Sequence, residues 1–397
     1  MVAIQAFPSK EVEPRRVTVL GSTGSVGCNT VSMLESDSGQ YQVEALTARS
    51  NVKLLAEQAR RLKPKMVVVS DKSFYGDLKR ELAGLGVEVL AGDESVVEAA
   101  NLTADWVMAA IVGTAGLAPT LAAIRHGAVV ALANKECLVS AGGLLTKEVK
   151  KYDADLLPVD SEHNGIFQVF DFDHPEGVEK IILTASGGPF RCFNRRQMRD
   201  VTPEEAVAHP NWKMGKKISI DCATMMNKGL ERIEAFHLFP VEQKQIEILI
   251  HPQSVVHSMV TYCDGSVLAQ LGMPDMRVPI AFTLAWPNRI SVPVARLDLA
   301  EIGQLTFEHP SEALFPALRV AREVLEEGGS APAAMSAANE IAVEGFLERR
   351  IGFLEIVELV ERTLCKIPHL KIETIEEVSE VDSEARRLAK DLIRGSR

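Results

Sequence analysis

The first part of the chain alternates short apolar runs with stretches of helical periodicity, for example at residues 120–126. Short apolar runs separated by helices are typical of buried parallel strands joined by right-handed crossovers. We therefore expect an α/β fold that begins with a doubly wound, Rossmann-like domain over residues 1–150. The apolar runs lie at 17–20, 43–46, 66–70, 87–90, 106–112 and 128–133.

After residue 151 the pattern changes. Further apolar runs predict strands, and Asp264-Gly265 between the last two is a strong hairpin signal, so we expect a central α+β domain with a mixed sheet over residues 151–290. Residues 291–310 show little periodicity and predict a linker, and residues 311–397 predict a C-terminal helical bundle. The expected strands are 180–185, 246–250, 254–262 and 266–271, and the expected C-terminal helices are 312–327, 332–349, 353–365 and 383–394.

A glycine-rich loop, Gly21-Ser-Thr-Gly24-Ser-Val-Gly27, follows the first apolar run and precedes a helical pattern. This order is the context of a dinucleotide phosphate loop, because glycines let the backbone approach a pyrophosphate and the helix N-terminus supplies N–H groups. After the second strand come Arg49 and Ser50, where NAD-binding chains usually carry an acidic residue. A cation and a hydroxyl suit a 2′-phosphate and favour NADP, although Arg49 is equally compatible with a solvated loop.

Polar residues follow another apolar run as Asn134-Lys135-Glu136. Ligands bind at the carboxyl ends of strands in such folds, so Lys135 is a candidate to hold a substrate hydroxyl and Glu136 to orient it. The plain alternative is a helix-capping turn.

A second polar stretch, Leu157-Pro-Val-Asp-Ser-Glu-His-Asn164, contains Asp160 and Glu162. In an extended backbone these carboxylates point the same way and repel each other unless a cation lies between them. They predict half of a site for magnesium or manganese, the alternative being a solvated loop. Downstream, Asn227, Lys228 and Glu231 share one face of a predicted helix, which offers a third carboxylate. The alternative there is a surface ion pair between Lys228 and Glu231.

Residues 186–216 have the composition of an anion-binding loop and a lid. Ser186-Gly-Gly-Pro-Phe-Arg191 predicts a backbone nest. Trp212 lies in a basic loop between Pro210 and Gly215, which indicates a lid that excludes water. The alternative is that Trp212 is buried for structural reasons.

Composition excludes some classes of protein. The net charge of −11 argues against a general nucleic-acid binder, and no apolar stretch of about 18 residues predicts a membrane span. The six cysteines form no Cys-x-x-Cys pair, and the first 16 residues lack the apolar core of a signal peptide. We therefore expect a cytoplasmic protein with reduced thiols.

These motifs together carry a resemblance. The glycine loop, Asn134-Lys135-Glu136, the stretch around Asp160, the Ser186 loop and His209-Pro-Asn-Trp212 occur in this order, followed by Ala223-Thr-Met-Met-Asn-Lys-Gly-Leu-Glu231 and His251-Pro-Gln-Ser-Val-Val-His257. The chain strongly resembles the 1-deoxy-D-xylulose 5-phosphate reductoisomerase family over nearly its whole length past residue 15.

The resemblance implies a homodimer, formed through the 151–290 domain, that uses NADPH and one divalent cation (Mn²⁺, Mg²⁺ or Co²⁺). It implies metal ligands at Asp160, Glu162 and Glu231, and catalytic roles for Lys135, Glu162, His209 and Glu231. Substrate contacts are then expected at Lys135, Ser161, Glu162, Ser186, His209, Trp212, Cys222, Asn227, Lys228 and Glu231. Cofactor contacts are expected at Gly21, Thr23, Gly24, Ser25, Val26, Arg49, Ser50, Asn51, Asn134, Glu136 and Gly215.

The chain departs from the family pattern at two places. The family usually has Asp-Ser-Ala-Thr where this chain has Cys222, so a thiol, which is a weaker donor, replaces a hydroxyl. Where the family often has Gly-Lys before Asn51, this chain has Arg49-Ser50, which keeps a cation.

The reaction that the resemblance implies is the rearrangement and reduction of 1-deoxy-D-xylulose 5-phosphate to 2-C-methyl-D-erythritol 4-phosphate in non-mevalonate isoprenoid biosynthesis. The carbon skeleton can rearrange by retro-aldol cleavage and re-addition or by an α-ketol shift, and both routes stay open. One rival is another NADP-dependent dehydrogenase, of the semialdehyde or homoserine type, which needs no three-carboxylate site. The other is a dinucleotide sensor that binds NADPH without turnover.

Overall fold

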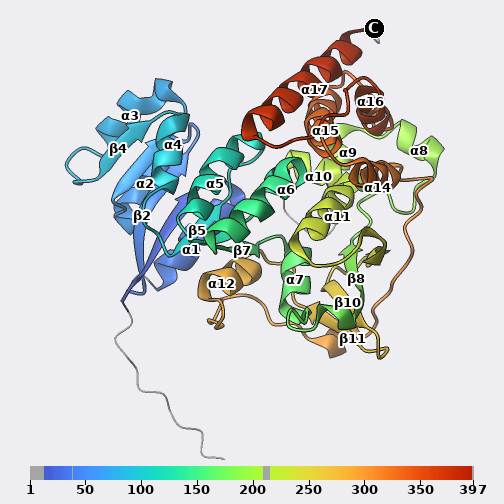
Figure 1. Cartoon of the computed structure of the whole chain (residues 1–397), viewed down its shortest axis with the longest axis horizontal. Helices are drawn as coiled ribbons and strands as arrows, with labels where there is room; N and C mark the ends of the chain where they lie inside the picture. Colours follow the sequence, from blue (N-terminus) through green and yellow to red (C-terminus); the bar gives the residue numbers. More distant parts are fainter. Residues whose placement is uncertain (1–12, 38, 209–214, 396–397) are drawn as a thin grey trace, which may run out of the picture.

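The computed structural model describes residues 13–37, 39–208 and 215–395. These residues form two sheets and a set of C-terminal helices (Figure 1). The first sheet is coloured from blue through cyan to green and the second from green to yellow; they lie on opposite sides of the view, and the C-terminal helices lie along one edge of the second.

The first sheet has seven strands in the order β4-β3-β2-β1-β5-β6-β7, and every pair is parallel. The strand order reverses between β1 and β5, so the carboxyl ends of these strands border the crevice where such sheets bind ligands. The predicted doubly wound fold is confirmed. Its strands are β1 (Arg15–Leu20), β2 (Tyr41–Ala48), β3 (Met66–Val69), β4 (Glu88–Ala91), β5 (Trp106–Ala109), β6 (Val129–Leu132) and β7 (Asp155–Pro158); its helices are α1 (Ser25–Ser36), α2 (Val52–Leu62), α3 (Tyr75–Glu81), α4 (Asp93–Ala100), α5 (Leu117–Arg125) and α6 (Lys135–Tyr152).

The expected domain boundary at residue 150 is wrong. It falls inside α6, and the chain then returns to the same sheet, where β7 pairs with β6. The change to polar residues after β7 predicted a new domain, but these residues directly follow the last strand of the first domain. Asp160 therefore lies at the carboxyl end of the same sheet as the glycine loop.

The second sheet is mixed, as predicted, in the order β11-β10-β8-β9. Strand β8 pairs parallel with β9 and antiparallel with β10, and β10 and β11 form the hairpin that Asp264-Gly265 predicted. Its strands are β8 (Val178–Ala185), β9 (Ile246–Ile250), β10 (Val256–Tyr262) and β11 (Val267–Leu271); the helices of this region are α7 (Ser161–Val169), α8 (Arg195–Arg199), α9 (Pro203–Ala206), α10 (Lys216–Ala223), α11 (Met226–Leu238) and α12 (Arg277–Ala285).

The C-terminal helices pack on one another as the predicted bundle, and this bundle also packs against the rest of the molecule through α15. Helix α15 is buried almost all round, and its alanines belong to two buried cores, one that contains Leu138 of α6 and one that contains Ile233 of α11. A helix that is apolar on every side belongs in a core, so it joins the two domains. The helices are α14 (Ala317–Glu327), α15 (Ala331–Leu347), α16 (Glu355–Leu364) and α17 (Ile375–Gly395), which begins earlier than predicted; the expected linker contains α13 (Leu299–Ile302).

Helix α11 contacts α14 closely at Gly229. A Cβ atom at this position would lie 2.8 Å from Cβ of Ala321 and 3.3 Å from the carbonyl oxygen of Ala317. Glycine is unfavourable inside a helix, and the close approach of α14 explains its presence. No helix within the described ranges is long and apolar enough to cross a membrane.

Candidate active site

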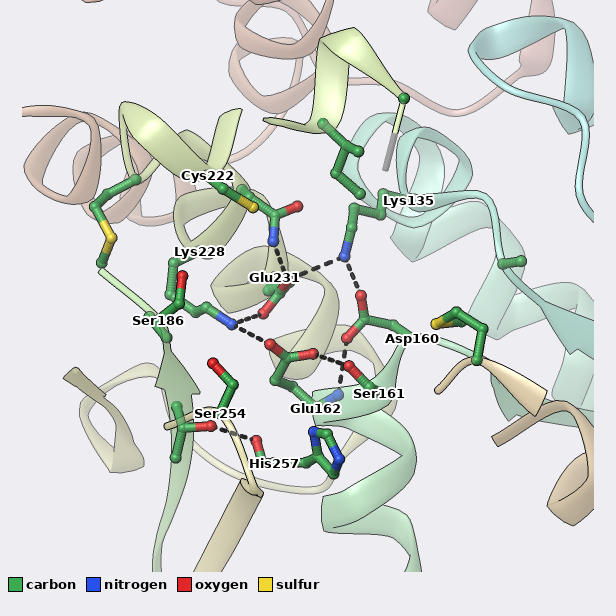
Figure 2. Close-up of a pocket in the computed structure, with 18 of the residues that line it drawn as sticks. Lys135, Asp160, Ser161, Glu162, Ser186, Cys222, Lys228, Glu231, Ser254 and His257 are labelled. Atoms are coloured by element: carbon green, nitrogen blue, oxygen red, sulfur yellow. Dashed lines mark hydrogen bonds and ion pairs between the residues drawn. The ribbon is translucent and has the colours of Figure 1, made fainter. Parts of the chain in front are cut away.

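A pocket lies where the first sheet's crevice faces the second sheet. The glycine loop side contributes Ser25 and Val26, and α6 contributes Lys135. The remaining wall comes from the start of α7, the end of β8, and α10 and α11 (Figure 2). The sequence-predicted residues that the pocket brings together are Ser25, Val26, Lys135, Asp160, Ser161, Glu162, Ser186, Gly215, Cys222, Asn227, Lys228 and Glu231.

Asp160 and Glu162 lie together for a different reason from the one predicted. Asp160 is the N-cap of α7, and its Oδ1 accepts from the backbone N–H of Glu162 at 3.2 Å and of His163 at 3.4 Å. Glu162 is in the first turn of that helix. The backbone is therefore the start of a helix and not extended, and the cap holds both carboxylates toward the pocket.

Helix α11 supplies the third carboxylate. One oxygen from each of Asp160, Glu162 and Glu231 lies within 4.8 Å of the others. Three hard oxygen donors at this spacing fit a single Mg²⁺ or Mn²⁺ ion. Burial, together with the charges of Asp160 and Glu162, raises the pKa of Glu231 to about 7.

Two lysines neutralise these carboxylates. Lys228 Nζ lies 2.8 Å from Glu162 Oε1 and also contacts Glu231, to which Asn227 donates a further hydrogen bond. Lys228 is 3% exposed and Glu231 is fully buried, so the alternative of a surface ion pair is wrong. Lys135 Nζ contacts Asp160 and lies 3.2 Å from Glu231 Oε1.

The pKa of Lys135 shows which effect dominates. Burial alone would lower it, but Asp160, Glu231 and Glu234 outweigh burial and hold the pKa well above its usual value. Burial would likewise raise the pKa of Asp160, and the Lys135 ammonium, with His163 and Lys228, holds it below its usual range instead. The ammonium groups of Lys135 and Lys228 thus balance the negative charge of the three carboxylates, which is the role that a bound cation would otherwise have.

The glycine loop side of the site is built from backbone and neutral side chains. Gly21 has φ +82°, and a Cβ there would lie 2.7 Å from the carbonyl oxygen of Ala110. Ser22 is buried; its hydroxyl donates to Gln58 Oε1 at 2.7 Å, and Gln58 Nε2 donates to its carbonyl at 2.9 Å. Gly21 N–H donates to Thr47 Oγ1 at 3.0 Å. These hydrogen bonds fix the loop against β2 and α2.

The other predicted cofactor residues border this crevice. Asn134 caps α6 by accepting from Cys137 N–H at 3.1 Å and donates to the Gly113 carbonyl at 2.9 Å, so the capping turn is real. Glu136 does not turn toward Lys135; it accepts from Lys217 Nζ at 3.1 Å. Arg49 and Ser50 are exposed at the end of β2, and Asn51 caps α2.

On the opposite side, Ser186 and two glycines form a turn that suits an anion. Gly187 and Gly188 have φ of +81° and +67°, and Gly188 N–H donates to Ser186 Oγ at 3.1 Å. Cys222 faces the pocket, and burial raises the pKa of its thiol, which keeps it protonated. His209 and Trp212 lie outside the described residues.

Sequence reasoning missed several residues of the site. His257 and Ser254 line the pocket, and His163 is buried directly behind Asp160. Glu234, one helical turn after Glu231, faces Lys135. The signal for the two histidines was present, because both lie inside motifs that carried the resemblance, and the spacing of Glu231 and Glu234 puts both on one helix face.

The fold and site define a class of protein: a doubly wound dinucleotide-binding oxidoreductase whose substrate pocket contains a cation site of three carboxylates. Three family models match the chain, "1-deoxy-D-xylulose 5-phosphate reductoisomerase" over residues 17–142 and the C-terminal domains of the same enzyme over 156–239 and 271–388. The chain belongs to the 1-deoxy-D-xylulose 5-phosphate reductoisomerase family, as the sequence motifs indicated.

Individual relatives agree. The reductoisomerase of Rhodospirillum centenum is 60% identical over 386 residues, which are 96% of each chain. The structure of the Zymomonas mobilis enzyme in complex with NADPH is 55% identical, with a TM-score of 0.92, over 96% of this chain and 99% of that one. A reductoisomerase in complex with NADPH, fosmidomycin and magnesium is 42% identical, with a TM-score of 0.90, over 96% and 98%. The chain is thus an enzyme of this family. This excludes the two alternative hypotheses, a semialdehyde or homoserine dehydrogenase and a dinucleotide sensor without turnover.

Proposed function

We propose that this chain converts 1-deoxy-D-xylulose 5-phosphate to 2-C-methyl-D-erythritol 4-phosphate, with NADPH as reductant and one divalent cation on Asp160, Glu162 and Glu231. The observation that carries this proposal is the meeting of three carboxylates with Lys135 and Lys228 in one pocket beside the glycine loop. The related structure with NADPH, fosmidomycin and magnesium supports both cofactors.

The substrate end of the pocket divides into two parts. A cation bound to the three carboxylates would act as a Lewis acid on two neighbouring substrate oxygens and make a hydroxyl more acidic. Lys135 and Ser161, on either side of these carboxylates, hold the substrate hydroxyls in place. The phosphate lies against Lys228, Asn227 and Ser186, which are one charged and two neutral residues that line the same pocket. Cys222 adds a weak donor, and His209 and Trp212 are further proposed contacts.

The cofactor end uses the glycine loop. NADPH would supply the hydride that reduces the rearranged aldehyde. The loop from Gly21 to Val26 holds the pyrophosphate by its backbone and by the N-terminus of α1. Arg49 and Ser50, with Asn51, take the 2′-phosphate end, and Asn134, Glu136 and Gly215 border the nicotinamide end.

We also propose that the chain forms a homodimer through the second sheet. Strand β11 is at the edge of that sheet, and its Val267 and Leu268 are about half exposed, at 51% and 49%. An exposed apolar edge strand is a ready surface for a second copy. Sedimentation velocity should show a dimer that Leu268→Arg converts to a monomer. Leu85→Arg, on an equally exposed leucine of the first domain, should leave the dimer intact.

A cytoplasmic location completes the proposal, and it is supported by six cysteines that are all free.

The reaction is tested by following NADPH absorbance with 1-deoxy-D-xylulose 5-phosphate and Mn²⁺, before and after a chelator is added. We expect oxidation that the chelator stops and that added Mn²⁺ restores. A folded protein that binds NADPH and Mn²⁺ but does not oxidise NADPH with this substrate would contradict the proposal.

A further inference from the structure

A fourth carboxylate, Glu234, lies behind the three that form the cation site. It is 3% exposed and follows Glu231 by one turn of α11. Its Oε2 atom lies 3.5 Å from Lys135 Nζ and 4.0 Å from His163 Nδ1. This buried oxygen has no hydrogen-bond partner among the described residues. A buried carboxylate in this state is costly, so its presence calls for a function.

The two lysines of the site compete with a cation for the same oxygens. Lys135 contacts Asp160 and Glu231, both of which belong to the three-carboxylate set. A divalent cation in that set repels the ammonium and takes over its partners. Lys135 therefore needs another anionic partner within reach if it is to stay in the pocket.

Glu234 is that partner. Of the three carboxylates that Lys135 meets within the described structure, only Glu234 is outside the cation set. Its position is fixed, because α11 packs tightly on α14 through Gly229 and because His163 Nε2 donates to the Glu231 carbonyl at 2.9 Å. The long side chain of Lys135 is the part that can move.

Lys228 shows the contrast. Its ion-pair partners within the described structure are Glu162 and Glu231, and both belong to the cation set (Figure 2). Among the described residues, Lys228 has no ion-pair partner outside the cation set, so cation binding leaves its ammonium available to an anionic group of the substrate. Lys135 has a reserve partner and stays beside the cation ligands.

We propose that Glu234 is a positioning residue that receives Lys135 when a cation occupies the carboxylates of Asp160 and Glu231, and that it thereby sets the affinity for the cation. The inference rests on the proposed cation site. It predicts that loss of Glu234 leaves Lys135 paired with the cation ligands, so that the ammonium competes with the metal.

The test measures Mn²⁺ binding without substrate, by the electron paramagnetic resonance signal of free Mn²⁺. Glu234→Gln should raise the Kd about tenfold, the lower end of the range for partners that orient metal ligands. Glu234→Asp, whose shorter side chain keeps the charge, should give a smaller rise. Glu44→Gln is the matched control, because Glu44 is also a buried carboxylate paired with a lysine, Lys65, in the first sheet. Its Kd for Mn²⁺ should equal that of the unmodified protein.

A double-mutant cycle with Lys135→Met tests whether Glu234 affects cation binding through Lys135. If Glu234 acts through Lys135, the change Glu234→Gln should alter the Kd less than about twofold once Lys135 is gone. An undiminished effect in that background, or an unchanged Kd in Glu234→Gln and Glu234→Asp, would overturn the inference. An unmodified protein that binds no Mn²⁺ would instead contradict the proposed cation site itself.

Discussion

The two ends of the pocket are built from opposite materials. At the cofactor end, Gln58, Thr47 and backbone groups hold the glycine loop through neutral hydrogen bonds that are complete within the chain. At the substrate end, buried carboxylates are held by Lys135 and Lys228, which take part in the same interactions that a cation would make. The cofactor end is thus formed before its ligand arrives, whereas the substrate end must exchange partners when it is occupied.

Because the cofactor end is held by neutral hydrogen bonds and the substrate end by ion pairs, substitutions should affect the two ends independently. Changes at the charged end should act on the cation and the phosphorylated substrate and leave NADPH affinity alone. Changes at the neutral end should do the reverse.

The largest effect is expected from Glu231→Gln, which removes a cation ligand and the partner of both lysines. Turnover should fall by more than about a hundredfold, the upper range for residues that only support a metal ligand. The Kd of NADPH, measured by its fluorescence, should change less than about twofold. Equal losses of turnover and NADPH binding would show that Glu231 supports the fold and not the charged end alone.

Lys228→Met should separate substrate from cation. A charge-assisted hydrogen bond contributes about 1.5–3 kcal/mol, so the KM for the phosphorylated substrate should rise about tenfold to a hundredfold. The Kd for Mn²⁺ without substrate should fall, because a competing ammonium is gone. Isothermal titration with Mn²⁺ measures this, and weaker binding would contradict the exchange of partners at the charged end.

Gln58→Leu is the matching change at the neutral end. It removes two hydrogen bonds to Ser22, each of about 1 kcal/mol, so the Kd of NADPH should rise on the order of tenfold. The Kd for Mn²⁺ should stay the same. If both ligands were weakened alike, the two ends would not be independent.

A pH-dependent prediction concerns His237, which lies where α11 packs against α6. Its ring packs against Gly142 of α6, and burial lowers its pKa from 6.5 to about 4. Below pH 6.5 the unfolded chain binds a proton that the folded protein does not, so stability falls as the pH falls toward 4. At pH 5 the loss is about 1–2 kcal/mol for this partly exposed ring. The free energy of unfolding, measured with urea at pH 5 and pH 7, should differ less between the two pH values for His237→Gln than for the unmodified protein. An equal difference in both proteins would show that His237 does not cause the loss of stability.

The smallest effect is expected from Cys222→Ser. A hydroxyl replaces a weaker thiol donor at the phosphate side, and one neutral hydrogen bond contributes about 1 kcal/mol. The KM should fall by about fivefold at most. Cys365→Ser, at an exposed cysteine, is the control and should leave the KM unchanged. A higher KM for Cys222→Ser would indicate that the pocket has adapted to sulfur.

Much of this arrangement was readable from the sequence. Helical spacing alone put Asn227, Lys228 and Glu231 on one face, because that relation is local. The pairing of Asp160 and Glu162 was anticipated from the wrong geometry, since alternation along a strand and the cap of a helix both bring them together. The end of β1 at Leu20 was also clear, because the glycine loop follows it, whereas the apolar run 106–112 continues past the end of β5 at Ala109.

What escaped prediction depends on contacts between distant segments. Lys135 meets Asp160 because β6 and β7 are neighbours in the sheet, and no local pattern states that order. The buried state of Lys228 follows from the packing of α11 on both the pocket and α14. The early start of α17 is an exception, because its signal is local: Thr374 and Glu377 form a capping box, in which Glu377 N–H donates to Thr374 Oγ1 at 3.2 Å and Thr374 N–H donates to the Glu377 carboxylate at 3.0 Å.

Gly229 has a consequence for how such a chain can vary over time. One side of α11 carries the charged residues of the pocket. On the other side Gly229, which has no side chain, packs directly against Ala317 and Ala321 of α14. A larger residue at 229 meets Ala321 and is tolerated only if residue 321 becomes smaller, whereas a larger residue at 321 cannot be compensated at 229, which is already glycine. Residues 229, 317 and 321 should therefore vary together among related sequences. A substitution in α14 can then alter ligand selectivity by moving α11, without replacing any pocket residue.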